Sequence, residues 1–163
     1  MQLGIVSDTH DDLDAVAEAV SVFEREGVDA VVHCGDFVAP FSAAPFDADF
    51  DFYAVRGNND GEWALQDVVS DFGTYLGEMS ELTLDGSDVA VYHGTSGPIV
   101  DALAECGTYD YVLHGHTHEY AHEQRSGTVR INPGGIPFGG DTGGHYAVVL
   151  ETESGEVERD ELF

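Results

Sequence analysis

Side chains that can bind metal ions recur along this chain, and each group of them directly follows a short apolar segment. Hard divalent cations favour oxygen ligands, whereas imidazole nitrogen suits zinc, manganese and iron. A single histidine at the end of a strand is more often a structural hydrogen-bonding residue, so the prediction of a metal site depends on the whole series. The clusters in the series are Asp8-x-His10, Gly35-Asp36, Gly57-Asn58-Asn59-Asp60, His93-Gly94 and Gly115-His116-x-His118.

The segments ahead of these clusters are expected to be buried strands, because they are short and apolar. Residues 156–162 alternate in polarity and predict either an edge strand or a solvated tail. In open α/β sheets, ligand sites lie at the carboxyl ends of the strands, so the clusters are expected to meet at such an edge. The predicted strands cover residues 2–7, 30–34, 52–56, 89–92 and 109–113, with further strands at 81–84, 129–131 and 146–150.

Helices are predicted between several of the strands. Residues 13–23 have the period of an amphipathic helix, residues 62–72 predict a short helix, and residues 98–106 predict a helix with a proline near its start. The chain between residues 34 and 52 predicts a loop or a short helix. The apolar face of the first helix is predicted to contain Leu13, Val16, Ala17, Val20 and Phe23.

The length of 163 residues favours a single domain over residues 1–163. No linker or internal repeat divides the chain. An apolar content of 42% is enough for a buried core, which argues against intrinsic disorder despite the high charge.

The charge balance is strongly acidic, with 32 acidic residues against 5 basic ones and a formal net charge of −27. All the basic residues are arginines. We interpret this as adaptation to a very salty cytoplasm, as in halophilic archaea, because the carboxylates are spread along the chain and salt screens their repulsion. The alternative is an ordinary acidic protein with an acidic face that binds a partner. Neither nucleic acid nor an anionic membrane is an expected partner, because no basic stripe could neutralise phosphates.

The location predicted from the sequence is the cytoplasm. The chain begins with a strand-like segment and not with a signal peptide, and no apolar run is long enough to span a membrane. Cys34 and Cys106 do not form a CxxC pair, so no disulfide framework is indicated.

The order of the clusters resembles that of the calcineurin-like metallophosphoesterase superfamily. The resemblance extends from Leu3 to Leu150 and implies an α/β (α+β) fold, a four-layer αββα sandwich of two mixed sheets flanked by helices. Two segments are similar to the small YfcE-like phosphodiesterase branch of that superfamily. They are Val55-Arg56-Gly57-Asn58-Asn59-Asp60 and Ile131-Asn132-Pro133-Gly134.

The same resemblance implies a role for each residue of a dinuclear metal site. Asp36 would bridge two divalent ions, for which Mn²⁺ is the first expectation and Ni²⁺, Fe²⁺, Zn²⁺ or Mg²⁺ are the alternatives. A hydroxide between the ions would attack the phosphorus of a small phosphoester substrate. The first ion would be bound by Asp8, His10 and His118, and the second by Asn58, His93 and His116.

Asn59 departs from the pattern of the superfamily, in which many members carry a histidine that assists the leaving group. An asparagine amide cannot protonate a leaving group at neutral pH, although it can donate a hydrogen bond. Asn59 is therefore the candidate catalytic residue outside the metal ligands, and substrates with good leaving groups are expected. Arg56 is the candidate substrate-binding residue, which would clamp a phosphate or form an internal ion pair with a nearby aspartate instead.

Other conspicuous side chains are given structural interpretations. Two histidines beside the metal motifs would pack there or support the ligands, the cysteines would be buried, and two aromatic residues would pack in the core or else line a substrate pocket. The glycine-rich segment 134–144 predicts tight turns without an assigned role. These residues are His33 and His114 beside the motifs, the ordinary histidines His122 and His145, the cysteines Cys34 and Cys106, and the aromatic residues Trp63 and Phe138.

The expected function is hydrolysis of a small phosphodiester by a metal-dependent enzyme. A phosphomonoesterase or a nucleotide pyrophosphatase on the same site is the alternative enzyme. A scaffold similar to the phosphoesterase-like subunit of retromer is the alternative without catalysis, although a pure scaffold need not keep all of the ligands. Members of the superfamily are often dimers, so a homodimer is a further expectation.

Overall fold

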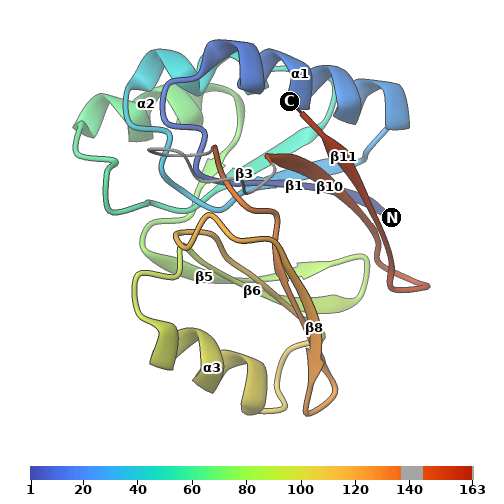
Figure 1. Cartoon of the computed structure of the whole chain (residues 1–163). Helices are drawn as coiled ribbons and strands as arrows, with labels where there is room; N and C mark the ends of the chain where they lie inside the picture. The colour runs from blue at the N-terminus through green and yellow to red at the C-terminus, as the bar shows by residue number, and fades with distance from the viewer. Residues whose placement is uncertain (137–144, 163) are drawn as a thin grey trace.

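Two β-sheets face each other, and helices cover their outer sides (Figure 1). This arrangement is that of a computed structural model, which describes residues 1–136 and 145–162. Helices α1 and α2 lie above the first sheet in Figure 1, and α3 lies below the second. The four layers confirm the predicted αββα sandwich of two mixed sheets.

The first sheet has six strands in the order β11-β10-β1-β2-β3-β4. Strands β1 to β4 are parallel, whereas β10 and β11 run antiparallel to their neighbours. Because parallel strands end at the same edge of a sheet, the loops that follow β1 to β4 leave the sheet side by side. The strands cover Gln2–Val6 (β1), Ala30–His33 (β2), Asp51–Ala54 (β3), Thr74–Tyr75 (β4), Tyr146–Glu151 (β10) and Glu156–Glu161 (β11).

The second sheet has five strands in the order β5-β6-β7-β9-β8. Strands β6, β7 and β9 are parallel, and β5 and β8 are antiparallel edges. The strands cover Met79–Leu84 (β5), Ser87–Tyr92 (β6), Tyr111–Leu113 (β7), Ala121–Arg125 (β8) and Thr128–Asn132 (β9).

Helix α1 (Leu13–Glu26) lies on the outer face of the first sheet. Asp12 caps its N-terminus by accepting a hydrogen bond from the Ala15 amide at 3.0 Å, and Gly27 ends it in the left-handed conformation with a φ of 65°. The predicted apolar face is wrong in part, because Leu13 is 46% exposed and Ala17 is exposed as well. The residues that α1 buries are Ala15, Val16, Ala19, Val22 and Phe23.

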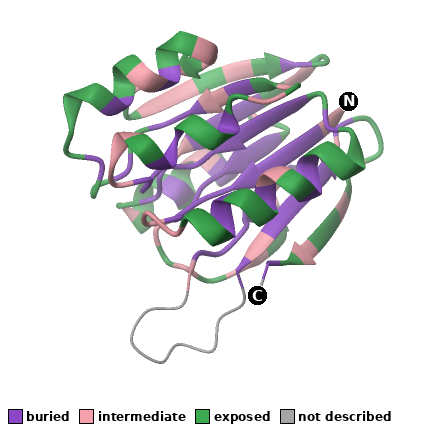
Figure 2. Ribbon diagram, turned by 90° about the horizontal axis from the view of Figure 1, so that it is seen from above, coloured by how far each residue is buried: buried purple, intermediate pink, exposed green. Residues whose placement is uncertain are grey.

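Two hydrophobic cores hold the layers together, and β1 contributes to both because successive side chains of a strand point to opposite faces. Val6 belongs to the core under the helices, which also contains Phe23 of α1. Leu3 and Ile5 belong to the core between the sheets, together with Val91 of β6. Figure 2 shows the buried strands lying behind the exposed outer faces of the helices.

The other two helices follow strands of different sheets. Helix α2 (Trp63–Phe72) buries Leu65 and Val69 in the core under the helices. Helix α3 (Gly97–Glu105) packs against β7 and β9 on the outer face of the second sheet.

The segment after β2, for which a loop or a short helix was predicted, forms two 3₁₀ helices, at Pro40–Ser42 and Ala44–Phe46. Two strands differ from those expected. Strands β4 and β8 were not predicted, because β4 has only two residues and β8 is a polar edge strand without an apolar run. The prediction of an edge strand near the C-terminus is confirmed by β11. Phe138 and the glycine-rich stretch after Ile136 lie outside the described residues.

Two further expectations concern the helices and the cysteines. Within residues 1–136 and 145–162, no helix combines the length and apolarity needed to cross a membrane. Both cysteines are free thiols. Cys34 is buried as predicted, whereas Cys106 is exposed, so the prediction for Cys106 is wrong.

Candidate metal centre

The seven predicted ligands meet where loops from both sheets face each other. Five of them line a pocket of about 330 Å³ together with Val38 and Asn59. The other two, Asp8 and His93, are 0% and 1% exposed. Asp8 and His10 follow β1, Asp36 follows β2, Asn58 follows β3, His93 follows β6, and His116 and His118 follow β7.

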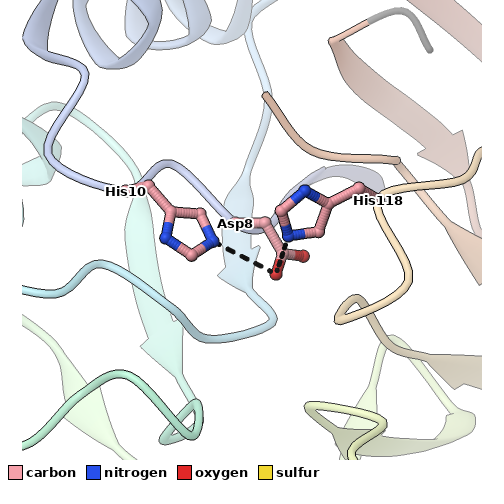
Figure 3. Close-up of side chains that lie close together, drawn as sticks. All are labelled: Asp8, His10 and His118. Atoms are coloured by element: carbon pink, nitrogen blue, oxygen red, sulfur yellow. Dashed lines mark ion pairs between the residues drawn. The ribbon is translucent and has the colours of Figure 1, made fainter. Parts of the chain in front are cut away.

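The two oxygens of the Asp8 carboxylate have different surroundings. Oδ2 accepts hydrogen bonds from Ser7 Oγ at 2.6 Å and from the His116 amide at 3.0 Å. Oδ1 is buried and receives no hydrogen bond from the described residues. Instead, His118 Nε2 lies 3.3 Å from Oδ1 and His10 Nε2 lies 3.8 Å from it (Figure 3). A buried carboxylate oxygen without a donor is costly unless a cation faces it, so this atom fits a metal ion.

The charge state of Asp8 suits a cation ligand. Burial raises the pKa of Asp8, but contacts with His10, His118 and Ser7 outweigh burial and hold the pKa below its usual range. Asp8 in turn raises the pKa of His118. The carboxylate is therefore ionised at neutral pH.

Asp36 lies between imidazoles from the two sheets. Its Oδ2 is 3.5 Å from His10 Nε2 and 3.4 Å from His93 Nε2. Asn59 orients the carboxylate by donating from its amide to Oδ1 and from Nδ2 to Oδ2, both at 2.8 Å. Burial opposes ionisation, but His93 and Asn59 outweigh it and lower the pKa of Asp36. This is the position that a bridging ligand would need.

Backbone carbonyls orient two of the histidines. His93 Nδ1 lies 2.8 Å from the Cys34 carbonyl, and His118 Nδ1 lies 3.1 Å from the Ile136 carbonyl. A carbonyl only accepts, so each Nδ1 carries the donated proton and each Nε2 keeps a lone pair for a metal. In both side chains, Nε2 is the atom that faces the Asp8 carboxylate.

Asn58 and His116, which were predicted for the second ion, lie beside His93. Asn58 Oδ1 is 3.1 Å from His93 Nε2. The His116 ring packs edge-on against the His93 ring, with centroids 5.2 Å apart. Both residues line the pocket, where they are available to a bound ion.

The backbone of the ligand loops is strained. A positive φ is uncommon outside glycine, because it brings the Cβ atom too close to the backbone. Such residues cost about 1–3 kcal/mol each, and they cluster at functional sites. The ligands with positive φ are Asp8 (55°), His10 (44°), Asp36 (63°), His116 (69°) and His118 (57°).

Two glycines of the predicted motifs lie directly against the carboxylates. A Cβ atom on Gly115 would overlap Ser7 Oγ and Asp8 Oδ2. A Cβ atom on Gly57 would overlap the Asp36 carboxylate and amide. These glycines therefore leave the space in which the carboxylates can turn toward an ion.

The donor atoms form two groups that could each hold an ion. In each group the atoms lie within 4.8 Å of one another. Donors on one ion sit about 2.0–2.2 Å from it and hence about 3–3.5 Å apart, so only small movements would close either group. The mixed oxygen and nitrogen donors fit divalent ions such as manganese, iron or zinc. The first group is Asp8, His10 and His118, and the second is Asp8, Asp36 and His93.

Asp60 was not predicted as a site residue, yet it ties two ligand loops together. Its Oδ2 accepts from the amides of Asp36 at 2.9 Å and Gly57 at 2.7 Å. Its Oδ1 accepts from the Val38 amide at 2.8 Å. The signal for this role was its place as the last residue of the Gly-Asn-x-Asp motif.

Asn132 has the corresponding role in the second sheet. Its Nδ2 donates to the Gly115 carbonyl at 3.0 Å and to Thr117 Oγ1 at 2.9 Å, and its Oδ1 accepts from the Gly134 amide at 2.9 Å. It therefore supports the loop that carries His116 and His118. The signal was the Asn-Pro-Gly turn, to which no role had been given.

Arg56 does not line the metal pocket. Its Nη1 pairs with Glu78 Oε1 at 3.0 Å, and its Nε donates to the Asp60 carbonyl at 3.0 Å. The alternative of an ion pair is thus found, with a glutamate instead of an aspartate. The side chain lines a neighbouring pocket together with Trp63, and its contact with substrate stays a prediction.

His33 and His114 are buried beside the ligands, as predicted. The Gly35 amide donates to His33 Nδ1 at 3.1 Å, and His33 Nε2 lies 3.1 Å from Thr9 Oγ1. Arg130 Nε donates to His114 Nε2 at 2.8 Å. Burial lowers the pKa of His33 to about 3, and burial together with Arg130 lowers the pKa of His114 to about 4. Both side chains are therefore neutral supports.

The remaining side chains give mixed outcomes. His122 is exposed on β8, as expected for an ordinary histidine. His145 is 1% exposed, and burial lowers its pKa to about 4. Trp63 is 87% exposed, so the prediction that it packs in the core is wrong and its alternative place at a pocket is found.

Imidazoles and carboxylates on loops between two facing mixed sheets are the arrangement of a metallophosphoesterase. The chain belongs to the calcineurin-like phosphoesterase superfamily, since the profile of that superfamily's domain matches residues 1–155. The chain is similar to phosphodiesterase MJ0936 of Methanocaldococcus jannaschii, with 34% identity over 167 residues that cover 96% of both proteins.

Solved structures agree with this assignment. The chain is similar to a structure described as a novel archaeal phosphodiesterase, with a TM-score of 0.91, 33% identity and 99% of both chains covered. It is also similar to the phosphoesterase YfcE of E. coli, with a TM-score of 0.69, 20% identity and 100% of both chains covered. The second likeness shows the fold alone. The resemblance seen in the sequence motifs is thereby confirmed.

Proposed function

We propose that this chain is a divalent-metal-dependent phosphodiesterase that hydrolyses a small phosphodiester. The observation that carries the proposal is the buried Asp8 Oδ1, which faces imidazole nitrogens from both sheets. A relative that is 34% identical over nearly its whole length is named a phosphodiesterase. This supports a phosphodiesterase over the alternatives of a phosphomonoesterase or a nucleotide pyrophosphatase.

The proposed assignment of residues to two ions is the one that the family resemblance implies. Asp36 would contact both ions, which its position supports because its Oδ2 lies between His10 and His93. Two divalent ions, when bound, supply the acidity that ionises a water and the positive charge that stabilises the phosphoryl oxygens. Two Mn²⁺ ions are proposed, with Ni²⁺, Fe²⁺, Zn²⁺ or Mg²⁺ as alternatives, because the donor atoms are a mixture of oxygen and nitrogen. Asp8, His10 and His118 would hold the first ion, and their donor atoms form one of the two groups described above. Asn58, His93 and His116 would hold the second ion, and of these His93 belongs to the other group.

Asn59 acts through Asp36 in this proposal and is a positioning residue. Its two donated hydrogen bonds fix the direction of both carboxylate oxygens. Its amide cannot transfer a proton to a leaving group at neutral pH. We therefore expect substrates whose leaving group departs without being protonated by Asn59.

The test is hydrolysis of bis-p-nitrophenyl phosphate by metal-free protein to which Mn²⁺ is added in molar KCl. Hydrolysis that requires the ion and disappears in Asp36→Ala is expected, with circular dichroism to check that the variant is folded. A folded wild type that hydrolyses the ester with no divalent ion contradicts the proposal. If Mn²⁺ binds and still no hydrolysis occurs, the scaffold becomes the better interpretation.

We further propose that the protein works in a very salty cytoplasm, as a halophilic protein would. The support is the ratio of 32 acidic to 5 basic residues and the free thiols, which agree with a reducing compartment. The melting temperature is expected to rise from low salt to molar KCl, because salt screens the repulsion. An equal rise with sucrose, which screens no charge, would contradict the proposal. A homodimer stays a prediction, which sedimentation at several protein concentrations checks.

A further inference from the structure

A second pocket, of about 260 Å³, lies beside the metal centre and has no role in the chemistry proposed above. It combines two aromatic side chains with polar and charged ones, which is the composition of a small-molecule site. We call it the Trp63 pocket. Its side-chain walls are Arg56, Glu62, Trp63, Gln66, Tyr75 and Glu78.

The Trp63 pocket and the metal pocket share the carboxyl edge of the first sheet. Strands β1 to β4 are parallel neighbours. The loops after β1, β2 and β3 carry candidate metal ligands, and the segments after β3 and β4 line the Trp63 pocket. The loop after β3 borders both spaces. Asn58 and Asn59 line the metal pocket, and the next two residues, Asp60 and Gly61, line the Trp63 pocket. The two pockets are therefore neighbours along this loop.

The indole of Trp63 is not used by the core. Helix α2 buries Leu65 and Val69, whereas Trp63, its first residue, is 87% exposed. A large aromatic side chain gains from being covered, and a planar ring covers it best by stacking. The exposed indole thus indicates a planar ligand.

The charges of the Trp63 pocket disfavour a second phosphate. Arg56 is the only cation among the lining residues, and it already pairs with Glu78 and with the Asp60 carbonyl. The carboxylates of Glu62 and Glu78 repel anions and accept hydrogen bonds from amino and hydroxyl groups. The pocket therefore suits an uncharged planar ring that carries hydrogen-bond donors.

We propose that the Trp63 pocket binds the nucleobase of a nucleoside phosphodiester whose phosphate lies at the metal centre. This inference rests on the proposed phosphodiesterase activity. Trp63 stacks on the base, and Gln66 and Glu62 form hydrogen bonds with the polar edge of the base. Arg56 shapes the pocket through its ion pair with Glu78 and does not clamp the phosphate.

Trp63 is the single tryptophan of the chain, so its fluorescence reports directly on this pocket. Adenosine, which carries no phosphate, is titrated into metal-free protein in molar KCl, with excitation where adenosine does not absorb. Saturable quenching is expected, and Gln66→Ala should weaken it. The control is Ile99→Ala, which removes an apolar side chain that is 48% exposed on α3 and should bind adenosine as the wild type does.

Two results of this titration would overturn the inference. The first is the absence of saturable quenching, or equal quenching by ribose alone. The second is a blue shift of Trp63 emission that grows with protein concentration before adenosine is added, which would mean that a second copy of the chain covers the indole.

Two esters with the same leaving group separate this inference from the proposed function. They are adenosine 5′-(p-nitrophenyl phosphate) and methyl p-nitrophenyl phosphate, both assayed with Mn²⁺. The adenosine ester is expected to have the lower KM. Trp63→Ala is expected to raise the KM of the adenosine ester about tenfold and to leave the KM of the methyl ester unchanged. Equal KM values for two hydrolysed esters contradict the nucleobase site alone. Failure to hydrolyse either ester contradicts the phosphodiesterase itself.

Discussion

The two sheets contribute different atoms to the metal centre. The first sheet supplies all the oxygen donors and one imidazole, whereas the second supplies only imidazoles. Among the seven residues neither sheet carries the whole set, so the centre depends on the packing of one sheet on the other. The oxygen-rich half suits hard cations and the nitrogen-rich half suits borderline ones. The first set is Asp8, His10, Asp36 and Asn58, and the second is His93, His116 and His118.

The sheets also support their ligands differently. Each carries a buried neutral histidine just ahead of a ligand, His33 in the first and His114 in the second. His33 stacks on the Phe37 ring with centroids 3.5 Å apart. His114 instead accepts a hydrogen bond from the Arg130 guanidinium. The first sheet thus adds ring stacking to the hydrogen bonds of its histidine, whereas the second adds a charged donor.

The largest expected effect comes from removing the oxygen donor that both sheets share. Asp36→Asn is expected to lose both ions in calorimetric titration, and kcat/KM to fall by at least about a thousandfold. His93→Gln, which removes one imidazole of the second sheet, is expected to keep one of the two ions. Asp49→Asn is the control, because it neutralises an exposed carboxylate outside the pocket. Unchanged stoichiometry in Asp36→Asn would break the assignment of a bridge.

Metal binding should stabilise the packing of one sheet on the other and so raise the free energy of unfolding. Mn²⁺ at about a hundred times its Kd contributes about 2.7 kcal/mol to the free energy of unfolding. For a domain of this length that raises the melting temperature by about 5–10 °C, as measured by calorimetry with and without chelator. His93→Gln should show a smaller rise. If Mn²⁺ does not change the melting temperature of the wild type, the ions do not couple the first sheet to the second.

A methyl group at either glycine tests the space around each carboxylate. Gly57→Ala in the first sheet and Gly115→Ala in the second should each cost about 1–3 kcal/mol of stability by overpacking, and both should weaken Mn²⁺ binding. Gly97→Ala is the matched control, because its Cβ would meet no atom within 4 Å. If both variants bind Mn²⁺ with the affinity of the wild type, the two glycines do not influence metal binding.

The pH dependence of stability follows from the two buried histidines. The pKa of His33 is about 3 and that of His114 about 4, against an ordinary value of 6.5. Below pH 6.5 the unfolded chain therefore binds more protons than the folded chain, and stability falls as the pH drops toward those values. Each histidine contributes about 1.4 kcal/mol per pH unit within its window.

Substitution of either buried histidine should flatten this dependence. His33→Gln and His114→Gln are each expected to reduce the slope of unfolding free energy between pH 6.5 and 4, measured in urea at constant KCl. His122→Gln is the control, since His122 is exposed on β8. If all three variants keep the wild-type slope, burial of the two histidines does not govern acid stability.

Most of the fold could be predicted from the sequence, because strands buried on both faces leave short apolar runs. Strand β8 could not, because it is a polar edge. The phase of α1 was missed because Leu13 is apolar yet lies outside the buried stripe. The exposure of Trp63 was missed because spacing alone does not show whether the first residue of a helix reaches the core.

The candidate site, like the fold, could be predicted from the sequence only in part. The candidate ligands, which the structure brings together, could be named from their residue types and order, since each cluster stands directly after a strand. The roles of Asp60 and Asn132 could not, because they depend on how closely loops from different strands approach one another in the folded chain. Hydrogen bonds of this kind join residues far apart in sequence and leave no period or composition to read.

Gly57 and Gly115 change how relatives of this protein should be compared. These two residues leave the space that two carboxylates of the candidate site occupy, since a Cβ atom at either position would fall on a carboxylate. A descendant could therefore keep all seven ligand residues and still lose the metal centre through one added carbon atom. A survey that looks for inactive members by counting ligands would classify such a chain as an enzyme, so these two glycines belong in the diagnostic pattern.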